Sequence, residues 1–223
     1  MAEEKEIIEG VELTAVDKLQ DFYEKNGTVV NVVVIGLLLL VIGGLFYMNV
    51  WKPKKEVAAQ EAIFMAQHYF ELDSFALALN GSGFDGFVDV ANNHGGTKAG
   101  NLANYYAGVC YYHLADYTNA VEYLGDFSTD DPIIGALGYN VMADAQMELG
   151  QADAALANYS KAANFSDNGA IAPVMILKAG MAYENQGKTA EAKEFYARIV
   201  EEFPTSDKVA DAELLLNKLD AAQ

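Results

Sequence analysis

The hydrophobic and polar positions of the chain first reveal one long apolar run. Residues 29–48 hold 20 consecutive uncharged positions, and Asn31 is their only strongly polar side chain. A helix of this length extends about 30 Å, the hydrocarbon thickness of a bilayer. Tyr47 and Trp51 follow at the end of the run, where aromatic residues favour a membrane interface. The pattern predicts an uncleaved transmembrane anchor over residues 29–51, surrounded by membrane lipid.

A short amphipathic segment precedes this run in residues 1–28. Its apolar residues recur at the spacing of one helical face and are Val16, Leu19, Phe22 and Tyr23. Asn26-Gly27 predicts a helix stop before the membrane run. A peptide that binds anionic lipid is usually basic, whereas this segment has eight acidic and three basic residues. We therefore expect the four apolar residues to dock on a membrane partner; the alternative is a helix that lies passively at the interface.

Residues 52–223 show helical periodicity with an internal repeat. Small residues open three successive copies at Gly108, Ala143 and Gly180, with spacings of 35 and 37 residues. In each copy a turn dipeptide follows, and then a second small residue. Small residues at these places allow two antiparallel helices to cross closely, and helix pairs of this kind stack into a solenoid. The pattern predicts an all-α fold in which a single N-terminal transmembrane helix precedes an α-solenoid of antiparallel helix pairs.

Two further segments extend the array. A degenerate earlier copy opens at Ala66, and the glycine-rich stretch 80–86 interrupts its second helix, which resumes at 87–93. A helix predicted over residues 207–221 would supply the terminal cap that repeat arrays need.

Charge and composition narrow the possible functions. The formal net charge is −18, and residues 56–223 contain 24 acidic and eight basic residues. Such a surface repels phosphate backbones, so we expect no nucleic-acid binding. The single cysteine, Cys110, excludes an internal disulfide. Acidity also keeps a repeat domain soluble and away from anionic headgroups.

Candidate chemistry is sparse. Residues 81–86 match the pattern G-x-G-x-x-G, but a dinucleotide site needs a strand before this loop, and helical sequence precedes it here. The three histidines lack the spacing of a metal pair. We expect no catalytic residue, no cofactor and no metal site, and we predict that the protein is not an enzyme.

The repeat pattern resembles the tetratricopeptide repeat, whose period is 34 residues. In that family the second, fifth, ninth and twelfth positions of each first helix line a concave groove. Carried onto this sequence, these positions are Leu102, Tyr105, Val109, Tyr112, Leu137, Asn140, Asp144, Met147, Val174, Leu177, Met181 and Glu184. The family's clamp for acidic peptides uses Lys, Arg and Asn there. A groove with one Asn and two acids instead suits an apolar helix or an extended segment. Alternatively, the C-terminal helix or the segment 60–79 fills it.

The order of an acidic amphipathic helix, one span and acidic repeats resembles the YfgM family of ancillary Sec translocon subunits in Gram-negative bacteria. The most specific match is Leu19-x2-Phe22-x2-Lys25-Asn26-Gly27, directly before the membrane run. The resemblance implies a single-pass inner-membrane protein with a cytoplasmic N-terminus and a periplasmic repeat domain. It also implies association with the SecYEG translocon and with a PpiD-type periplasmic chaperone. Translocating polypeptides are a further partner that we expect for the repeats.

The leading hypothesis is a non-enzymatic scaffold that holds a periplasmic chaperone or an emerging polypeptide near the channel exit. A structural adaptor of another envelope assembly, such as a secretion or division apparatus, would use the same groove. A cytoplasmic signalling adaptor is a third hypothesis. It rests on the lysines at 52, 54 and 55, which follow the span and would favour a cytoplasmic repeat domain. Charge alone does not fix the orientation.

Overall fold

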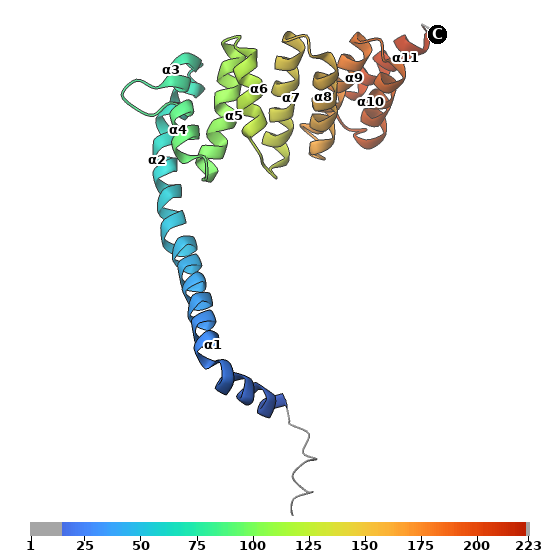
Figure 1. Ribbon diagram of the computed structural model, residues 1–223. Coiled ribbons are helices and arrows are strands. Elements are labelled where there is room, and N and C mark those ends of the chain that lie inside the picture. Colours follow the sequence, from blue (N-terminus) through green and yellow to red (C-terminus); the bar gives the residue numbers. More distant parts are fainter. Residues whose placement is uncertain (1–14, 222–223) are drawn as a thin grey trace, which may run out of the picture. The chain divides into compact units, whose positions relative to one another are not determined.

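The structure is a computed structural model that describes residues 15–221 of the chain (Figure 1). Regular structure in these residues is helical throughout, which confirms the all-α prediction. The chain divides into two compact units, Met1–Lys54 and Lys55–Gln223.

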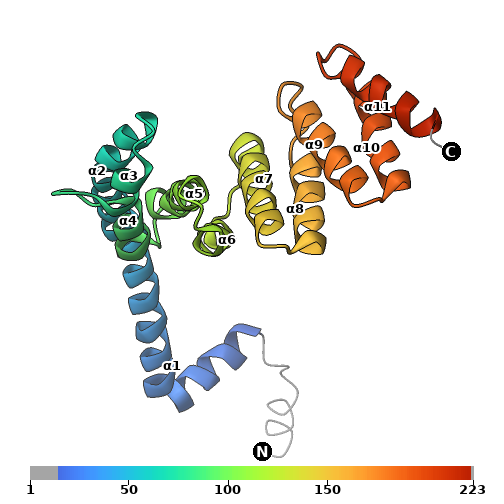
Figure 2. The same cartoon turned by 90° about the horizontal axis from the view of Figure 1, so that it is seen from above.

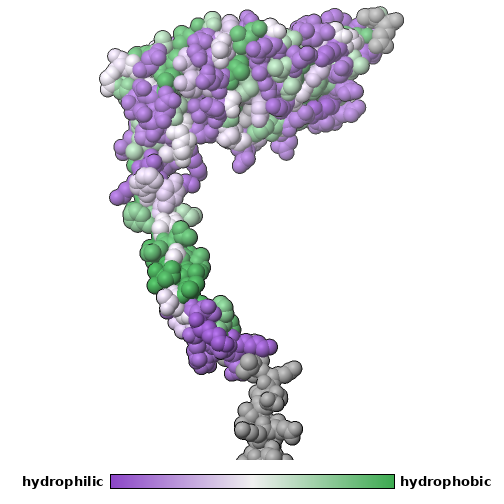
Figure 3. Space-filling model, in the orientation of Figure 1, coloured by the Kyte–Doolittle hydropathy of each residue, from purple (hydrophilic) through white to green (hydrophobic). Residues whose placement is uncertain are grey.

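The first unit contains α1 (Ala15–Phe46), which continues through a π-helical turn η1 (Tyr47–Trp51) into the start of α2 (Lys52–Glu71). By length and composition, this is a helix that could cross a membrane. Its apolar side chains, such as Leu39 and Leu40, are exposed, and Figure 3 shows the most hydrophobic residues gathered along α1. In a helix surrounded by lipid these side chains would lie in an apolar solvent.

The predicted helix stop at Asn26-Gly27 corresponds to a kink at Asn26, where two helices meet within α1. Only Asn26 has non-helical backbone angles, with φ −125° and ψ 17°. Its side-chain Nδ2 donates a hydrogen bond to the backbone carbonyl oxygen of Phe22 at 3.1 Å. A side chain that bonds to the backbone in this way is a common cause of a helix kink. Tyr23 donates from its hydroxyl to Oδ1 of Asn31 at 3.0 Å. The one strongly polar side chain of the apolar run therefore has a partner within α1.

The second unit is a stack of antiparallel helix pairs, as predicted. Figures 1 and 2 show its helices side by side in chain order. The remaining helices are α3 (Phe75–Asn80), α4 (Phe87–His94), α5 (Lys98–His113), α6 (Tyr117–Asp126), α7 (Pro132–Glu148), α8 (Ala152–Phe165), α9 (Ala172–Asn185), α10 (Thr189–Glu202) and α11 (Val209–Ala221). We call α2, α5, α7 and α9 the first helices of the four repeats, and α11 ends the stack.

Each first helix ends in the same backbone turn. A residue in the left-handed conformation follows it in all four repeats, at Asp73, Ala115, Gly150 and Gly187. The φ values lie between 55° and 73°. Glycine adopts this conformation without a steric cost, whereas an L-residue with a Cβ does not. Two of the four turns therefore use the residue type that suits them best.

The small residues that open the repeats lie where paired helices cross. A Cβ added to Gly108 would lie 2.5 Å from Cγ of Leu124, and one added to Gly180 would lie 2.5 Å from Cε1 of Tyr196. Ala143 is completely buried at the equivalent place. These positions confirm the predicted reason for the small residues.

The second helix of the first repeat is broken, as expected, into α3 and α4. Gly86, in the loop between them, approaches the backbone so closely that a Cβ would overlap the carbonyl oxygen of Leu79. This pair is also tied to the next repeat, because the Glu56 carboxylate accepts hydrogen bonds from the amides of Lys98 and Ala99 at 2.8 and 3.1 Å. A carboxylate at a helix N-terminus satisfies unpaired amides and favours the helix dipole. Glu56 thereby fixes α2 against α5.

Candidate functional site

The twelve predicted groove positions lie four each on α5, α7 and α9. Val109 and Asn140 are buried, Val174 and Met181 are exposed, and the other eight are half-buried. The buried pair is therefore closed to direct contact with a partner.

Asn140 and Asp144 begin a polar network on α7. Asn140 donates from Nδ2 to Oδ2 of Asp144 at 3.4 Å, and no described residue donates to its Oδ1. Asp144 also accepts a short 2.5 Å hydrogen bond from the Tyr159 hydroxyl. The ammonium of Lys178 lies 2.6 Å from Oδ2 of Asp144. Burial, together with the Asp144 carboxylate, raises the pKa of Tyr159 and keeps it protonated as the donor.

Glu184 on α9 repeats this arrangement. It accepts hydrogen bonds from the Tyr196 hydroxyl at 2.8 Å and from the Lys218 ammonium at 2.7 Å. The hydrogen bond from Lys218, followed by that from Tyr196, lowers the pKa of Glu184. In both networks the lysine follows its acid by 34 residues. Lys178 lies on α9, two helices after α7, and Lys218 lies on α11, two helices after α9. We call each set an acid–tyrosine–lysine bridge.

These bridges change the chemistry expected of the groove. Both of its acidic positions are neutralised within the chain, so neither is an open site for a basic peptide. The accessible side chains of the set are mainly aromatic or aliphatic, including Tyr105, Tyr112 and Met181. Their chemistry matches an apolar segment better than a charged one.

The C-terminal helix and the segment 60–79 are the two predicted occupants of the groove. α11 packs against α10 and continues the stack instead of lying along α5 and α7. The segment 60–79 forms most of α2 and part of α3, and α2 serves as the first helix of the first repeat. A depression of about 230 Å³ between α2 and α5 is lined by Gln60, Ile63, Gln67 and Leu102. This depression places α2 beside the predicted groove residue Leu102.

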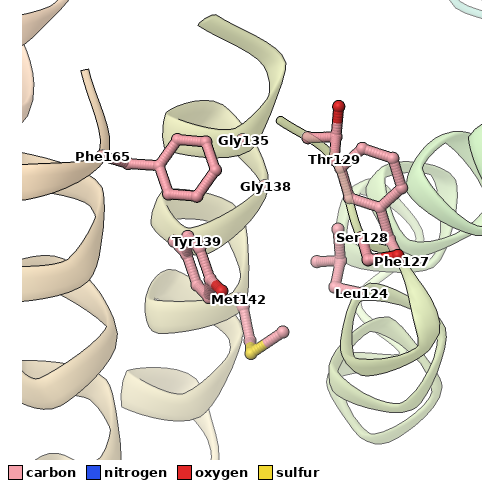
Figure 4. Close-up of a pocket in the computed structure, with 9 residues that line it drawn as sticks. All are labelled: Leu124, Phe127, Ser128, Thr129, Gly135, Gly138, Tyr139, Met142 and Phe165. Carbon is pink, nitrogen blue, oxygen red and sulfur yellow. The ribbon is translucent and has the colours of Figure 1, made fainter. Parts of the chain in front are cut away.

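A small pocket lies beside the predicted groove residue Tyr105 (Figure 4). Its volume is about 100 Å³, large enough for an aliphatic side chain. The lining residues come from α6, the following linker, α7 and α8, and are Leu124, Phe127, Ser128, Thr129, Gly135, Gly138, Tyr139, Met142 and Phe165. The Phe127 ring lies 5.3 Å from the ring of Tyr105, which places the pocket next to a predicted groove residue. The sequence reasoning missed this pocket, although Gly135 and Gly138 inside a helix were a usable signal.

A comparison with protein families gives the fold its name. A family model described as a tetratricopeptide repeat matches residues 102–132 and 175–206. These two segments of the chain are similar to tetratricopeptide repeats. The matched segments hold most of α5 and α6 and most of α9 and α10, and the structure shows the intervening pair, α7 and α8. No curated protein was found to match the chain.

Tetratricopeptide-like repeats generally act as non-catalytic scaffolds for protein interactions. Within residues 15–221, no three histidine, cysteine or acidic side chains form a group that could hold a metal ion. Cys110 is fully buried among apolar residues, and burial raises the pKa of its thiol to about 12. A thiol of this kind is a poor nucleophile at neutral pH.

The predicted docking residues before the span lie in the first unit. Leu19, Phe22 and Tyr23 are exposed on α1, on the N-terminal side of the Asn26 bend. Val16 belongs to the same helix, but its side chain lies outside the described part of the chain.

Proposed function

We propose that this protein is a non-enzymatic inner-membrane scaffold associated with the SecYEG translocon. Its repeat domain, on the periplasmic side, holds a PpiD-type chaperone or an emerging polypeptide near the channel exit. The main support is the order of the elements along the chain. An exposed apolar face comes first, on the part of α1 before Asn26; the long apolar run follows, and then the solenoid of tetratricopeptide-like repeats. Leu19, Phe22 and Asn26, which carry the resemblance to the YfgM family, lie on that face or at its bend.

The groove supports a protein partner of apolar character. Its acids are bridged to Lys178 and Lys218, and aromatic and methionine side chains remain accessible. Methionine and tyrosine adapt to partner segments of different shape.

Co-purification after gentle solubilisation tests the association with the translocon. The wild-type protein should be recovered with SecYEG, and Leu19→Asp with Phe22→Asp should abolish this recovery while the repeats stay folded. Lys18→Asp is the matched control, because it makes the same change of two charge units on the same exposed helix and should retain the translocon. Wild-type protein recovered without any Sec component would refute the proposal. Recovery with a secretion or division apparatus would favour the structural adaptor.

Protease treatment of spheroplasts tests the orientation. A periplasmic repeat domain is digested without lysis, whereas residues 1–28 remain protected. Full protection of the repeat domain would overturn the proposed localisation and favour a cytoplasmic adaptor.

A further inference from the structure

The first helix of each later repeat buries one face against the helix that precedes it. On α5 this face includes Ala99, Ala103, Ala107 and Cys110, each no more than 6% exposed. The contacts of α4 with α5, α6 with α7 and α8 with α9 repeat this packing along the stack. It is the interface through which one repeat is added to the next.

α2 presents the same face without a preceding helix. Because Ala66 and Gly108 occupy equivalent positions, the counterparts of Ala99, Ala103, Ala107 and Cys110 lie 42 residues earlier in the chain. They are Val57, Glu61, Met65 and His68, and all four are exposed.

Large apolar side chains dominate this face of α2. Val57 is 54% exposed, Phe64 66% and Met65 37%. The terminal faces of soluble solenoids are usually polar, because no neighbouring repeat covers them. An aromatic and two aliphatic residues along one helical face are instead typical of a protein interface, in which an exposed Phe supplies a large buried area. We call this face of α2 the N-terminal end face.

Charge selects the kind of helix that fits. Glu61 lies among the apolar residues of the end face, and Glu71 lies exposed near its C-terminal end. The unit that carries the face has 24 acidic and eight basic residues from residue 56 onward. A second copy of the chain would bring another strongly acidic surface against Glu61, which like-charge repulsion disfavours. A partner with a basic residue opposite Glu61 gains an ion pair where its apolar stripe is buried.

We propose that the N-terminal end face binds an amphipathic α-helix of another protein, with a lysine or arginine within its apolar stripe opposite Glu61. This helix would take the place that α4 takes against α5. The inference concerns a surface distinct from the groove and from Leu19 and Phe22, and it does not depend on an association with the translocon.

Model peptides give a direct test with the full-length protein in nanodiscs. Two synthetic helices of about 20 residues share one leucine stripe and differ only in a central lysine or glutamate. Fluorescence anisotropy should show tighter binding of the lysine peptide. Phe64→Asp should weaken this binding by about tenfold or more, the loss expected when an aromatic anchor is removed. Leu214→Asp, which alters an apolar residue 68% exposed on α11, is the matched control and should bind normally.

Reversal of one charge separates specific docking from general adhesion. Glu61→Lys should exchange the preference, so that the glutamate peptide binds more tightly than the lysine peptide. Because Glu61 and Phe64 are exposed, both variants should keep the helical circular dichroism of the wild type. A photoreactive residue in place of Phe64 should crosslink to the lysine peptide.

Three outcomes would overturn the proposal: an unchanged peptide preference in Glu61→Lys, equal binding by Phe64→Asp and the wild type, or crosslinks from position 64 only to a second copy. Loss of SecYEG from the Leu19 and Phe22 variant would leave these peptide results unaffected, so the two proposals fail separately.

Discussion

The turns after the first helices predict opposite effects for the same chemical change at two glycines. Gly150 has φ +71°, whereas Gly125 lies inside α6 with ordinary helical geometry. A Cβ added at either position meets no atom within 4 Å. Replacement by alanine therefore tests backbone conformation without a packing contribution.

The magnitudes follow from the backbone. An L-residue in the left-handed region costs about 1–2 kcal/mol, and alanine recovers about 0.4–1 kcal/mol by restricting the unfolded chain. Gly150→Ala should thus destabilise the repeats by about 0.5–1 kcal/mol. Gly125→Ala should stabilise them by up to about 1 kcal/mol, because alanine favours helix more than glycine. Ala115→Gly removes the cost at φ +59° and should stabilise by about 0.5–1 kcal/mol.

Urea unfolding of the full-length protein in detergent, followed by far-ultraviolet circular dichroism, measures these changes. Hydrogen exchange of the amides in α7 and α8 shows whether the effect of Gly150→Ala is local, as neighbour-coupled repeats require. Equal signs for Gly150→Ala and Gly125→Ala would refute the reasoning, since conformation is the only difference between the two sites that it uses.

The bridges and the buried thiol yield three further predictions. Asp144→Asn and Lys178→Met, made singly and together, should give a coupling energy of about 1 kcal/mol that falls with salt, because Lys178 is partly exposed; zero coupling at low salt would contradict it. Iodoacetamide at pH 8 should label Cys110 in denaturant but not in the native protein, and rapid native labelling would argue against the raised pKa. The lowered pKa of Glu184 adds stability that is present above its ordinary value of 4.5 and is lost as the pH falls through the depressed value. In Lys218→Met the unfolding free energy should therefore decrease less steeply as the pH is lowered. The same pH dependence as in the wild type would contradict the stabilisation of ionised Glu184 by Lys218.

The repeat architecture was predictable because close helix crossings impose local demands on residue size. Gly108, Ala143 and Gly180 each meet a neighbouring helix where a larger side chain would overlap, so their spacing exposes the period. The broken second helix was also readable from residues 80–86, since successive glycines favour loop conformations. Both the small residues at the helix crossings and the glycines in residues 80–86 can be recognised from the sequence, because each meets a geometric requirement at its own position.

The bridges escaped prediction because they depend on how successive repeats stack. Asp144 and Lys178 are 34 residues apart, and only the rotation between repeats decides whether their side chains meet. A search for opposite charges at the repeat period would have found them. The kink that separates two helices at Asn26 was predictable from Asn26-Gly27, a pair that favours a helix end.

The stack of repeats also affects how the domain can fold. Helices make their contacts chiefly with neighbours in the sequence, so a low contact order favours rapid folding that spreads from one repeat to the next. The contact between the first and second repeats includes two hydrogen bonds from the amides of Lys98 and Ala99 to the Glu56 carboxylate, across 42 and 43 residues. Because folding of a repeat array can begin at any repeat, an emerging chain can complete its N-terminal repeat while later residues are still being delivered.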